Sequence, residues 1–188
     1  MQQRLSELLS YMDTTRERLL ATVREINPTF AGVRPRGDSW SVEEIVAHLA
    51  IVEERISRLV ADAVEWAKEN DVGPATTDES VMSSLDEHSV VEPPVRKQAP
   101  KAVMPPEGRP IDESLGTLRD SRTRLRDALI AGDAFDMGKV KRPHASFGDL
   151  DVAQWALFVA QHEERHRRQI ERTMDEVTEL AAECAPIV

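Results

Sequence analysis

The sequence predicts an all-α protein that folds as a four-helix bundle. Four segments carry apolar residues at the spacing of amphipathic helices, and no segment shows a convincing strand pattern. Residues 71–110, between the second and third segments, hold seven of the 11 prolines and no sustained apolar period. The chain of 188 residues is of a length typical for one domain, which we expect to span residues 1–188.

The first helix is expected over residues 3–26, because apolar residues recur there at helical spacing and the pair Asn27-Pro28 ends the pattern. The apolar face of this helix consists of Leu5, Leu8, Leu9, Met12, Leu19, Leu20, Val23 and Ile26.

The second helix is expected to begin at Ser41 and to end near Trp66 or Glu69. Ser41 and Glu44 have the spacing of a capping box, in which each residue satisfies a free backbone N–H at the helix start. Its apolar face consists of Ile45, Val52, Ile56, Leu59, Ala63 and Trp66, and His48 lies in the middle of this face.

The third helix is expected over residues 112–131, with Gly132 suited to its C-terminal cap. The fourth is expected over residues 151–182, where Asp151 and Gln154 again have the capping-box spacing. The inward residues of these two helices are Leu115, Leu118, Leu125 and Leu129, then Trp155, Phe158, Val159, Ile170, Val177 and Leu180.

Residues 71–110 form a long connection. Such connections are lids, binding loops or disordered spacers, and we expect this one to be a poorly ordered crossover. Its length permits the second and third helices to run parallel, so simple up-down-up-down topology is not required.

The composition excludes several classes of function. The chain has 34 acidic and 24 basic residues, a net charge of −10, and no long basic run, which argues against nucleic-acid binding. No apolar run is long enough to cross a bilayer, and the first residues lack the apolar core of a signal peptide. The single cysteine, Cys184, rules out an internal disulfide and fits a reducing compartment. We expect a cytoplasmic protein with no membrane partner.

Three histidines are the strongest candidates for chemistry. His162 and His166 are one helical turn apart on the apolar face of the fourth helix, and His48 lies on the apolar face of the second. Buried imidazoles need partners, and a metal ion satisfies all three at once. Three imidazoles suit zinc, nickel or iron and leave positions open for ligands. The alternative is that each histidine is simply hydrogen-bonded in the core. His88 and His144 have no such context, so we expect His88 to be solvated and His144 to border a site at most.

Two other metal motifs overlap this pair. Residues 162–166 read H-E-E-R-H and fit the zinc-protease pattern H-E-x-x-H, in which the glutamate is the general base. No further ligand follows at protease spacing and no sheet is available to align a peptide, so a protease is disfavoured. Glu163 and His166 also match half of a di-iron site, but a second E-x-x-H is absent.

Two blocks of sequence resemble the DinB/YfiT superfamily. The stretch Trp40 to Leu49, WSVEEIVAHL, is similar to the start of its second helix. Residues 143–150, Trp155 and residues 162–170 are similar to its last helix. The resemblance implies an up-down-down-up bundle, often dimeric, with a metal held by the matching residues His48, His162 and His166. It also implies activity as a thiol-dependent transferase or isomerase, or as a metal-dependent hydrolase.

These observations support three hypotheses. The first is a metal-dependent thiol S-transferase that binds a low-molecular-weight thiol as its thiolate, with Arg55 or Arg165 holding a carboxylate of the thiol or substrate. The second is a metal-dependent hydrolase in which Glu163 or Glu44 accepts a proton. The third is a non-catalytic stress or metal-binding protein. For each enzyme we expect a small-molecule substrate, a homodimer and no nucleic-acid partner.

Overall fold

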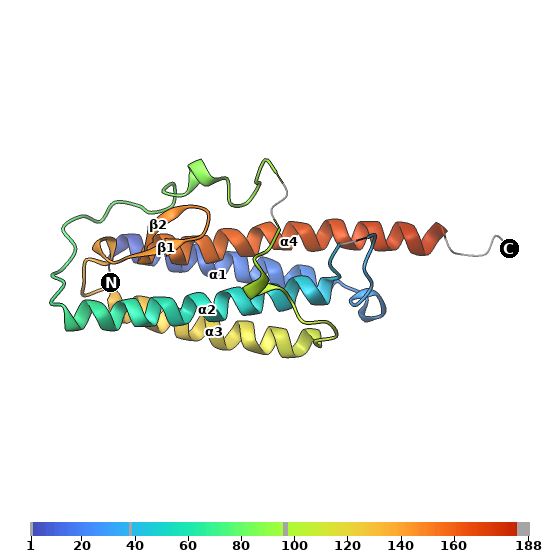
Figure 1. Ribbon diagram of the computed structural model, residues 1–188, viewed down its shortest axis with the longest axis horizontal. Helices are drawn as coiled ribbons and strands as arrows, with labels where there is room; N and C mark the ends of the chain where they lie inside the picture. The colour runs from blue at the N-terminus through green and yellow to red at the C-terminus, as the bar shows by residue number, and fades with distance from the viewer. Residues whose placement is uncertain (1, 38, 96–97, 184–188) are drawn as a thin grey trace.

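Four long helices lie side by side along the length of the molecule (Figure 1). The structure is a computed structural model that describes residues 2–37, 39–95 and 98–183. Its long helices are α1 (Gln3–Arg24), α2 (Val42–Glu69), α3 (Ile111–Gly132) and α4 (Val152–Glu183). The predicted four-helix bundle is therefore confirmed, and each helix begins and ends within about two residues of its expected bounds.

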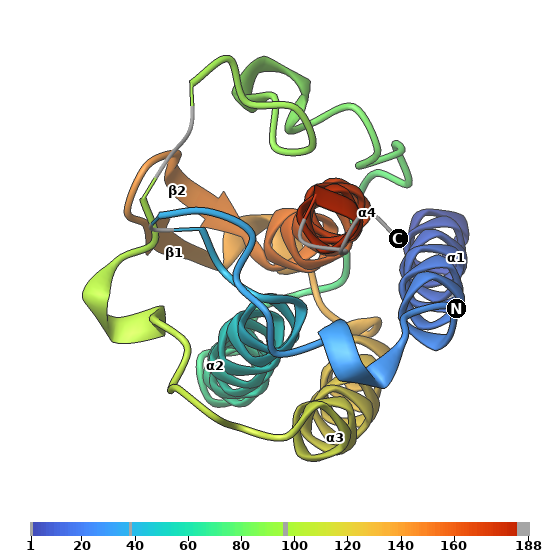
Figure 2. The same cartoon turned by 90° about the vertical axis from the view of Figure 1, so that its right-hand side faces the viewer.

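The helices follow an up-down-down-up order. Helices α1 and α4 run towards one end of the bundle, while α2 and α3 run parallel to each other in the opposite direction (Figures 1 and 2). Helix α1 packs on α4, α4 packs on α2, and α2 packs on α3. The connection after α2 must therefore return along the whole bundle before α3 begins.

The helix ends show how local sequence selects these elements. Ser41 and Glu44 form the predicted capping box at the start of α2. Gly132 is not the predicted C-terminal cap, because it is the last residue of α3, Asp133 is the cap, and Gly132 has no positive φ. A Cβ at Gly132 would lie 3.1 Å from Cγ2 of Val64 and 3.4 Å from Met137. Close packing, and not backbone conformation, therefore explains this glycine.

A short β-hairpin precedes α4, although the sequence indicated no strand. Strands β1 (Lys141–His144) and β2 (Gly148–Asp151) pair antiparallel, with Lys141 opposite Asp151 and His144 opposite Gly148. Gly148 has a φ of 76°, a conformation that glycine adopts without strain. Strands of four residues are too short for an alternating pattern to stand out, which explains why sequence periodicity misses them.

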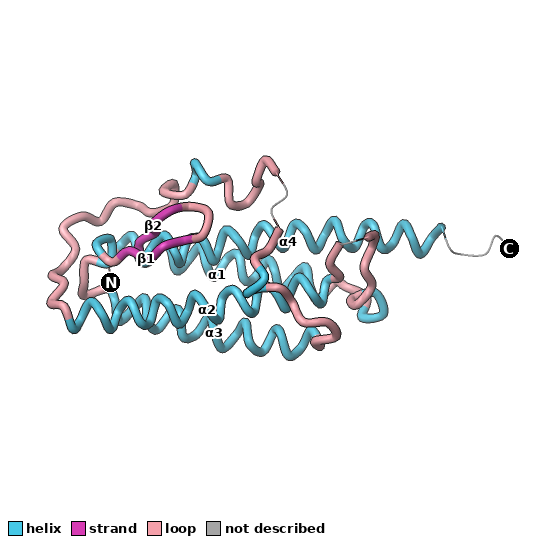
Figure 3. The backbone as a smooth tube through the Cα atoms, in the orientation of Figure 1, coloured by secondary structure: helices cyan, strands magenta, loops and turns pink. Residues whose placement is uncertain are grey.

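The connection between α2 and α3 packs on the bundle, so the expectation of a poorly ordered crossover was wrong. Val81, Leu85 and Val90 are buried in the main apolar core. Two short 3-10 helices, η2 (Asp86–His88) and η3 (Lys101–Val103), interrupt the otherwise irregular path (Figure 3). Two further 3-10 turns are η1 (Pro28–Phe30) and η4 (Met137–Lys139).

The described helices include none with the length and apolar character needed to cross a membrane. Cys184, the single cysteine, lies outside the described residues.

The packed connection makes a prediction about stability. Leu85 is fully buried, so Leu85→Ala should lower the free energy of unfolding by about 2–5 kcal/mol through lost apolar contacts and a residual cavity. Val95 of the same connection is 70% exposed, and Val95→Ala should change stability by no more than about 0.5 kcal/mol. Chemical denaturation measures both. Equal, small effects would show that the connection does not pack on the core.

Candidate metal centre

The three predicted histidines converge between α2 and α4. His48 of α2 and His162 and His166 of α4 are buried, with exposed fractions of 3%, 8% and 5%. One ring nitrogen from each lies within 4.8 Å of the others, an arrangement that can hold a metal ion. The imidazole centroids of His48 lie 5.2 Å from His162 and 4.9 Å from His166. The structure therefore brings together the residues that helical spacing placed on two separate faces.

Hydrogen bonds orient two of the rings. Nδ1 of His48 lies 2.7 Å from the carbonyl oxygen of Val103, and Nδ1 of His166 lies 2.8 Å from Oε1 of Gln169. Because a carbonyl or amide oxygen can only accept, both Nδ1 atoms carry the proton and both Nε2 atoms keep a lone pair. Partners of this kind fix the tautomer of metal-binding histidines.

The two ring nitrogens on α4 have a separation that suits a small divalent ion. Nε2 of His162 lies 3.1 Å from Nε2 of His166. Two nitrogens bonded to tetrahedral zinc at about 2.0–2.1 Å stand about 3.3 Å apart, so this pair needs little adjustment. Because Nε2 of His166 keeps a lone pair, Nε2 of His162 carries the proton in this contact. Binding of an ion through Nε2 of His162 would require the tautomer of that ring that carries its proton on Nδ1.

Burial keeps these histidines neutral. It lowers the pKa of His48, of His162 and of His166, the last to about 3. The positive charge of Arg165 lowers all three further. Neutral imidazole is the form that binds metals, so the site is ready for an ion at neutral pH.

The two predicted arginines differ in position. Arg165 is half-buried beside the histidines, and no hydrogen bond or ion pair joins it to another residue within the described ranges. Burial, followed by the nearby charge of Arg172, lowers its pKa. Arg55 is exposed, and no described contact links it to the three histidines. Only Arg165 is therefore placed to meet an anion at this site.

The two predicted proton acceptors are both engaged elsewhere. Glu163 is 1% exposed and accepts hydrogen bonds from Thr15, Arg16 and Arg122. Glu44 accepts bonds from Nε of Arg34 at 2.9 Å and from the backbone of its capping partner. Donors therefore already occupy the oxygens of both carboxylates. These contacts therefore give no support to the prediction that either glutamate accepts a proton.

Glu163 belongs to a buried group that we call the central charge cluster. This cluster consists of Arg16 of α1, Glu53 of α2, Arg122 of α3 and Glu163 of α4. The cluster was not predicted from the sequence, because arginines and glutamates on amphipathic helices usually face solvent.

Two aromatic rings lie beside the histidines, an arrangement that helical periodicity did not predict. Trp40 lies 5.0 Å from His48 and Phe158 stacks 5.2 Å from His162, measured between ring centroids. His144 borders these aromatic rings, as expected, with its ring centroid 4.9 Å from that of Phe158.

His88 differs from the expectation of a solvated side chain. Its ring stacks 4.4 Å from Phe147, which also stacks on His144. This contact ties the long connection to the hairpin.

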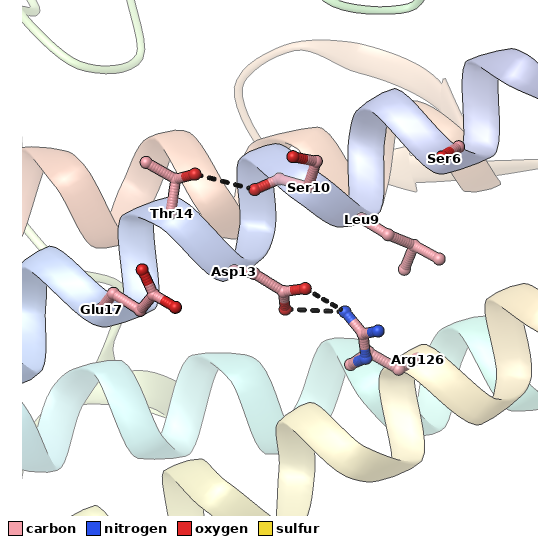
Figure 4. Close-up of a pocket in the computed structure, with 7 residues that line it drawn as sticks. All are labelled: Ser6, Leu9, Ser10, Asp13, Thr14, Glu17 and Arg126. Atoms are coloured by element: carbon pink, nitrogen blue, oxygen red, sulfur yellow. Dashed lines mark hydrogen bonds and ion pairs between the residues drawn. The ribbon is translucent and has the colours of Figure 1, made fainter.

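A separate groove of about 380 Å³ lies between α1 and α3. Its lining residues are Ser6, Leu9, Ser10, Asp13, Thr14, Glu17 and Arg126 (Figure 4). Arg126 pairs with Asp13 across it at 2.6 Å. No histidine lines this groove, so it is distinct from the candidate metal centre.

Comparisons with known proteins identify the family and agree with the fold. Residues 11–170 match the DinB superfamily. The chain is 22% identical over 148 residues to the uncharacterized protein YuaE of Bacillus subtilis (strain 168), a match that covers 77% of this chain and 83% of YuaE. The crystal structure of TT2238, a four-helix bundle protein, resembles it with a TM-score of 0.61 and 20% identity, over 89% of this chain and 98% of that one.

The buried histidines predict a pH dependence of the metal-free protein. In the folded protein the pKa of His166 is lowered from its ordinary value of 6.5 to about 3. Between these two pH values the unfolded chain therefore binds more protons than the folded protein. Stability should therefore fall as the pH drops from about 6.5. Glu44 and Glu164 have pKa values below their ordinary 4.5, so their stabilisation is lost only below about pH 4.5.

Denaturation with a chelator present, between pH 7 and 5, isolates the effect of the histidines. Replacing all three with asparagine should flatten the profile. An unchanged slope in that variant would contradict the assignment.

Proposed function

Because the chain belongs to the DinB superfamily, we propose that it binds one divalent metal ion through His48, His162 and His166 and acts as a metal-dependent thiol S-transferase. The observation that carries the proposal is the convergence of three buried imidazoles from two helices, two of them with their Nδ1 protons fixed on oxygen acceptors. A structural zinc site would have four protein ligands, whereas this one has three and leaves a position for an exogenous ligand.

The donor set fits zinc, nickel or iron, because neutral imidazole binds each of these ions. The three histidines would hold the ion, which would supply stabilisation of the thiolate form of a bound thiol. The thiol sulfur would then attack an electrophilic carbon of a small-molecule substrate. A bond to sulfur forms, the bond to the leaving group breaks, and the thiol proton passes to solvent.

The residues around the histidines have separate tasks in this proposal. Arg165 binds a carboxylate of the thiol or substrate, since its guanidinium has no anionic partner among the described residues. Trp40 and Phe158 limit the access of water. Val103 and Gln169 hold two ligand rings in place. The homodimer and the cytoplasmic location stay predictions.

Metal binding is tested first. Protein purified without a histidine tag should carry or take up about one equivalent of a divalent ion, because the three histidines form one site. His48→Ala, His162→Ala and His166→Ala should each lose most of this metal in elemental analysis. His88→Ala is the matched control and should retain it. Equal metal content in all four variants would contradict the site.

The reaction class is tested with the metal-loaded protein. Turnover of an alkyl or aryl halide should require an added low-molecular-weight thiol and should disappear in His162→Ala. Hydrolysis of esters or amides without any thiol would instead favour the hydrolase. Metal binding with no turnover across thiol, ester and amide panels would favour a non-catalytic metal-binding protein.

The predicted anchor can be tested in the same assay. Arg165→Gln should raise the KM for a carboxylate-bearing thiol by roughly 10–100-fold, because the variant loses one charge-assisted hydrogen bond. The KM for a neutral thiol should stay unchanged. Arg55→Gln is the comparison for the exposed arginine.

A further inference from the structure

The central charge cluster joins all four helices at one level of the bundle. Each arginine bridges both glutamates. Arg16 contacts Glu53 and Glu163 at 2.5 Å each, and Arg122 contacts them at 2.7 and 3.0 Å. The four side chains are between 2% and 11% exposed. The two positive and two negative charges cancel, so the cluster is neutral as a whole.

The remaining polar atoms of the cluster are also satisfied. Nη1 of Arg16 donates to the carbonyl of Leu118 at 3.0 Å, and Nη1 of Arg122 donates to the carbonyl of Met12 at 2.5 Å. Burial alone would lower the pKa of Arg122, but the charges of Glu163 and Glu53 outweigh burial and raise it. The cluster therefore has one well-defined arrangement.

The cluster forms a polar layer between two apolar cores. One core includes Met12, Ile56 and Leu125, and the other includes Leu19, Leu49, Leu118 and Ile170. Burying charges is costly, and apolar residues of similar volume often give equal or greater stability. A role in specifying geometry accounts for this layer better than a role in stability.

The geometry that this polar layer would specify is the arrangement of the three histidines. Glu163 directly follows His162, about 100° further around α4. Both oxygens of Glu163 accept hydrogen bonds from other helices. A rotation of α4 about its axis would break these bonds and would carry His162 and His166 away from His48. Glu53 lies five residues after His48, about 7.5 Å further along α2, and is held in the same way.

We infer that the central charge cluster is a positioning device for the candidate metal centre, an inference that rests on the metal binding proposed above. Arg16 and Arg122 set the spacing of α2 and α4 by bridging their glutamates, although neither arginine touches a ligand. Without these bridges, two like charges would face each other and push apart the helices that carry the histidines.

The test uses zinc and cobalt alone as probes on the full chain. Glu53→Gln removes one charge, and Arg16→Lys keeps the charge but loses the planar fork that holds two carboxylates. Both variants should weaken zinc affinity, measured against a chelator, by roughly 10–100-fold. Both should also shift the visible absorption bands of the cobalt-loaded protein, which report ligand geometry. Leu129→Ala is the control, because it removes a buried apolar side chain and should leave both readouts unchanged.

The possible outcomes distinguish the positioning role of the central charge cluster from the proposed metal site. Folded variants with wild-type zinc affinity and cobalt spectra would overturn the positioning role while leaving the proposed metal site intact. An equal spectral shift in Leu129→Ala would overturn it as well, because general loosening would then explain the effect. Wild-type protein that binds neither ion would overturn both proposals. If Glu53→Gln does not fold, Arg16→Lys decides.

Discussion

Two glutamates buried at the centre of a helical bundle must each be neutralised, and this requirement organises the whole structure. Glu53 and Glu163 lie on the two helices that carry the histidines, and the neutralising arginines come from the other two helices. Every helix is therefore tied to the same layer. Removing one partner of such a buried pair typically costs about 3–5 kcal/mol, because the remaining charge is left without compensation. The layer restricts how α2 and α4 can move, and the candidate metal centre lies where they meet.

The connection between α2 and α3 completes the site from outside the bundle. Parallel helices require a long return path, and here that path is packed: Leu85 is buried in the core, and the carbonyl of Val103 accepts from Nδ1 of His48. The same segment therefore provides the return path between the parallel helices and orients the ring of His48. His88 and Phe147 attach it to the hairpin before α4. Fold and site thus depend on a segment whose sequence shows no regular period.

Helical periodicity was sufficient to predict four helices and to place His48, His162 and His166 on buried faces. The same reasoning placed Glu163 beside the site but not its carboxylate among arginines, because a helical projection shows no partner helices. The hairpin was too short to show alternation. Contacts from the connection are invisible to any local pattern, since they join residues 55 positions apart, as in His48 and Val103. Local order was therefore predictable, whereas the surroundings of the site depend on tertiary packing.

The central claim is that three imidazoles bind one ion, and X-ray absorption spectroscopy of the zinc-loaded protein tests it most directly. We expect three imidazole nitrogens at about 2.0–2.1 Å, with the remaining position filled by a ligand from solution. Addition of a low-molecular-weight thiol should bring one sulfur into the shell at about 2.3 Å. A shell dominated by carboxylate oxygen, or one unchanged when His48 is replaced by alanine, would contradict the account.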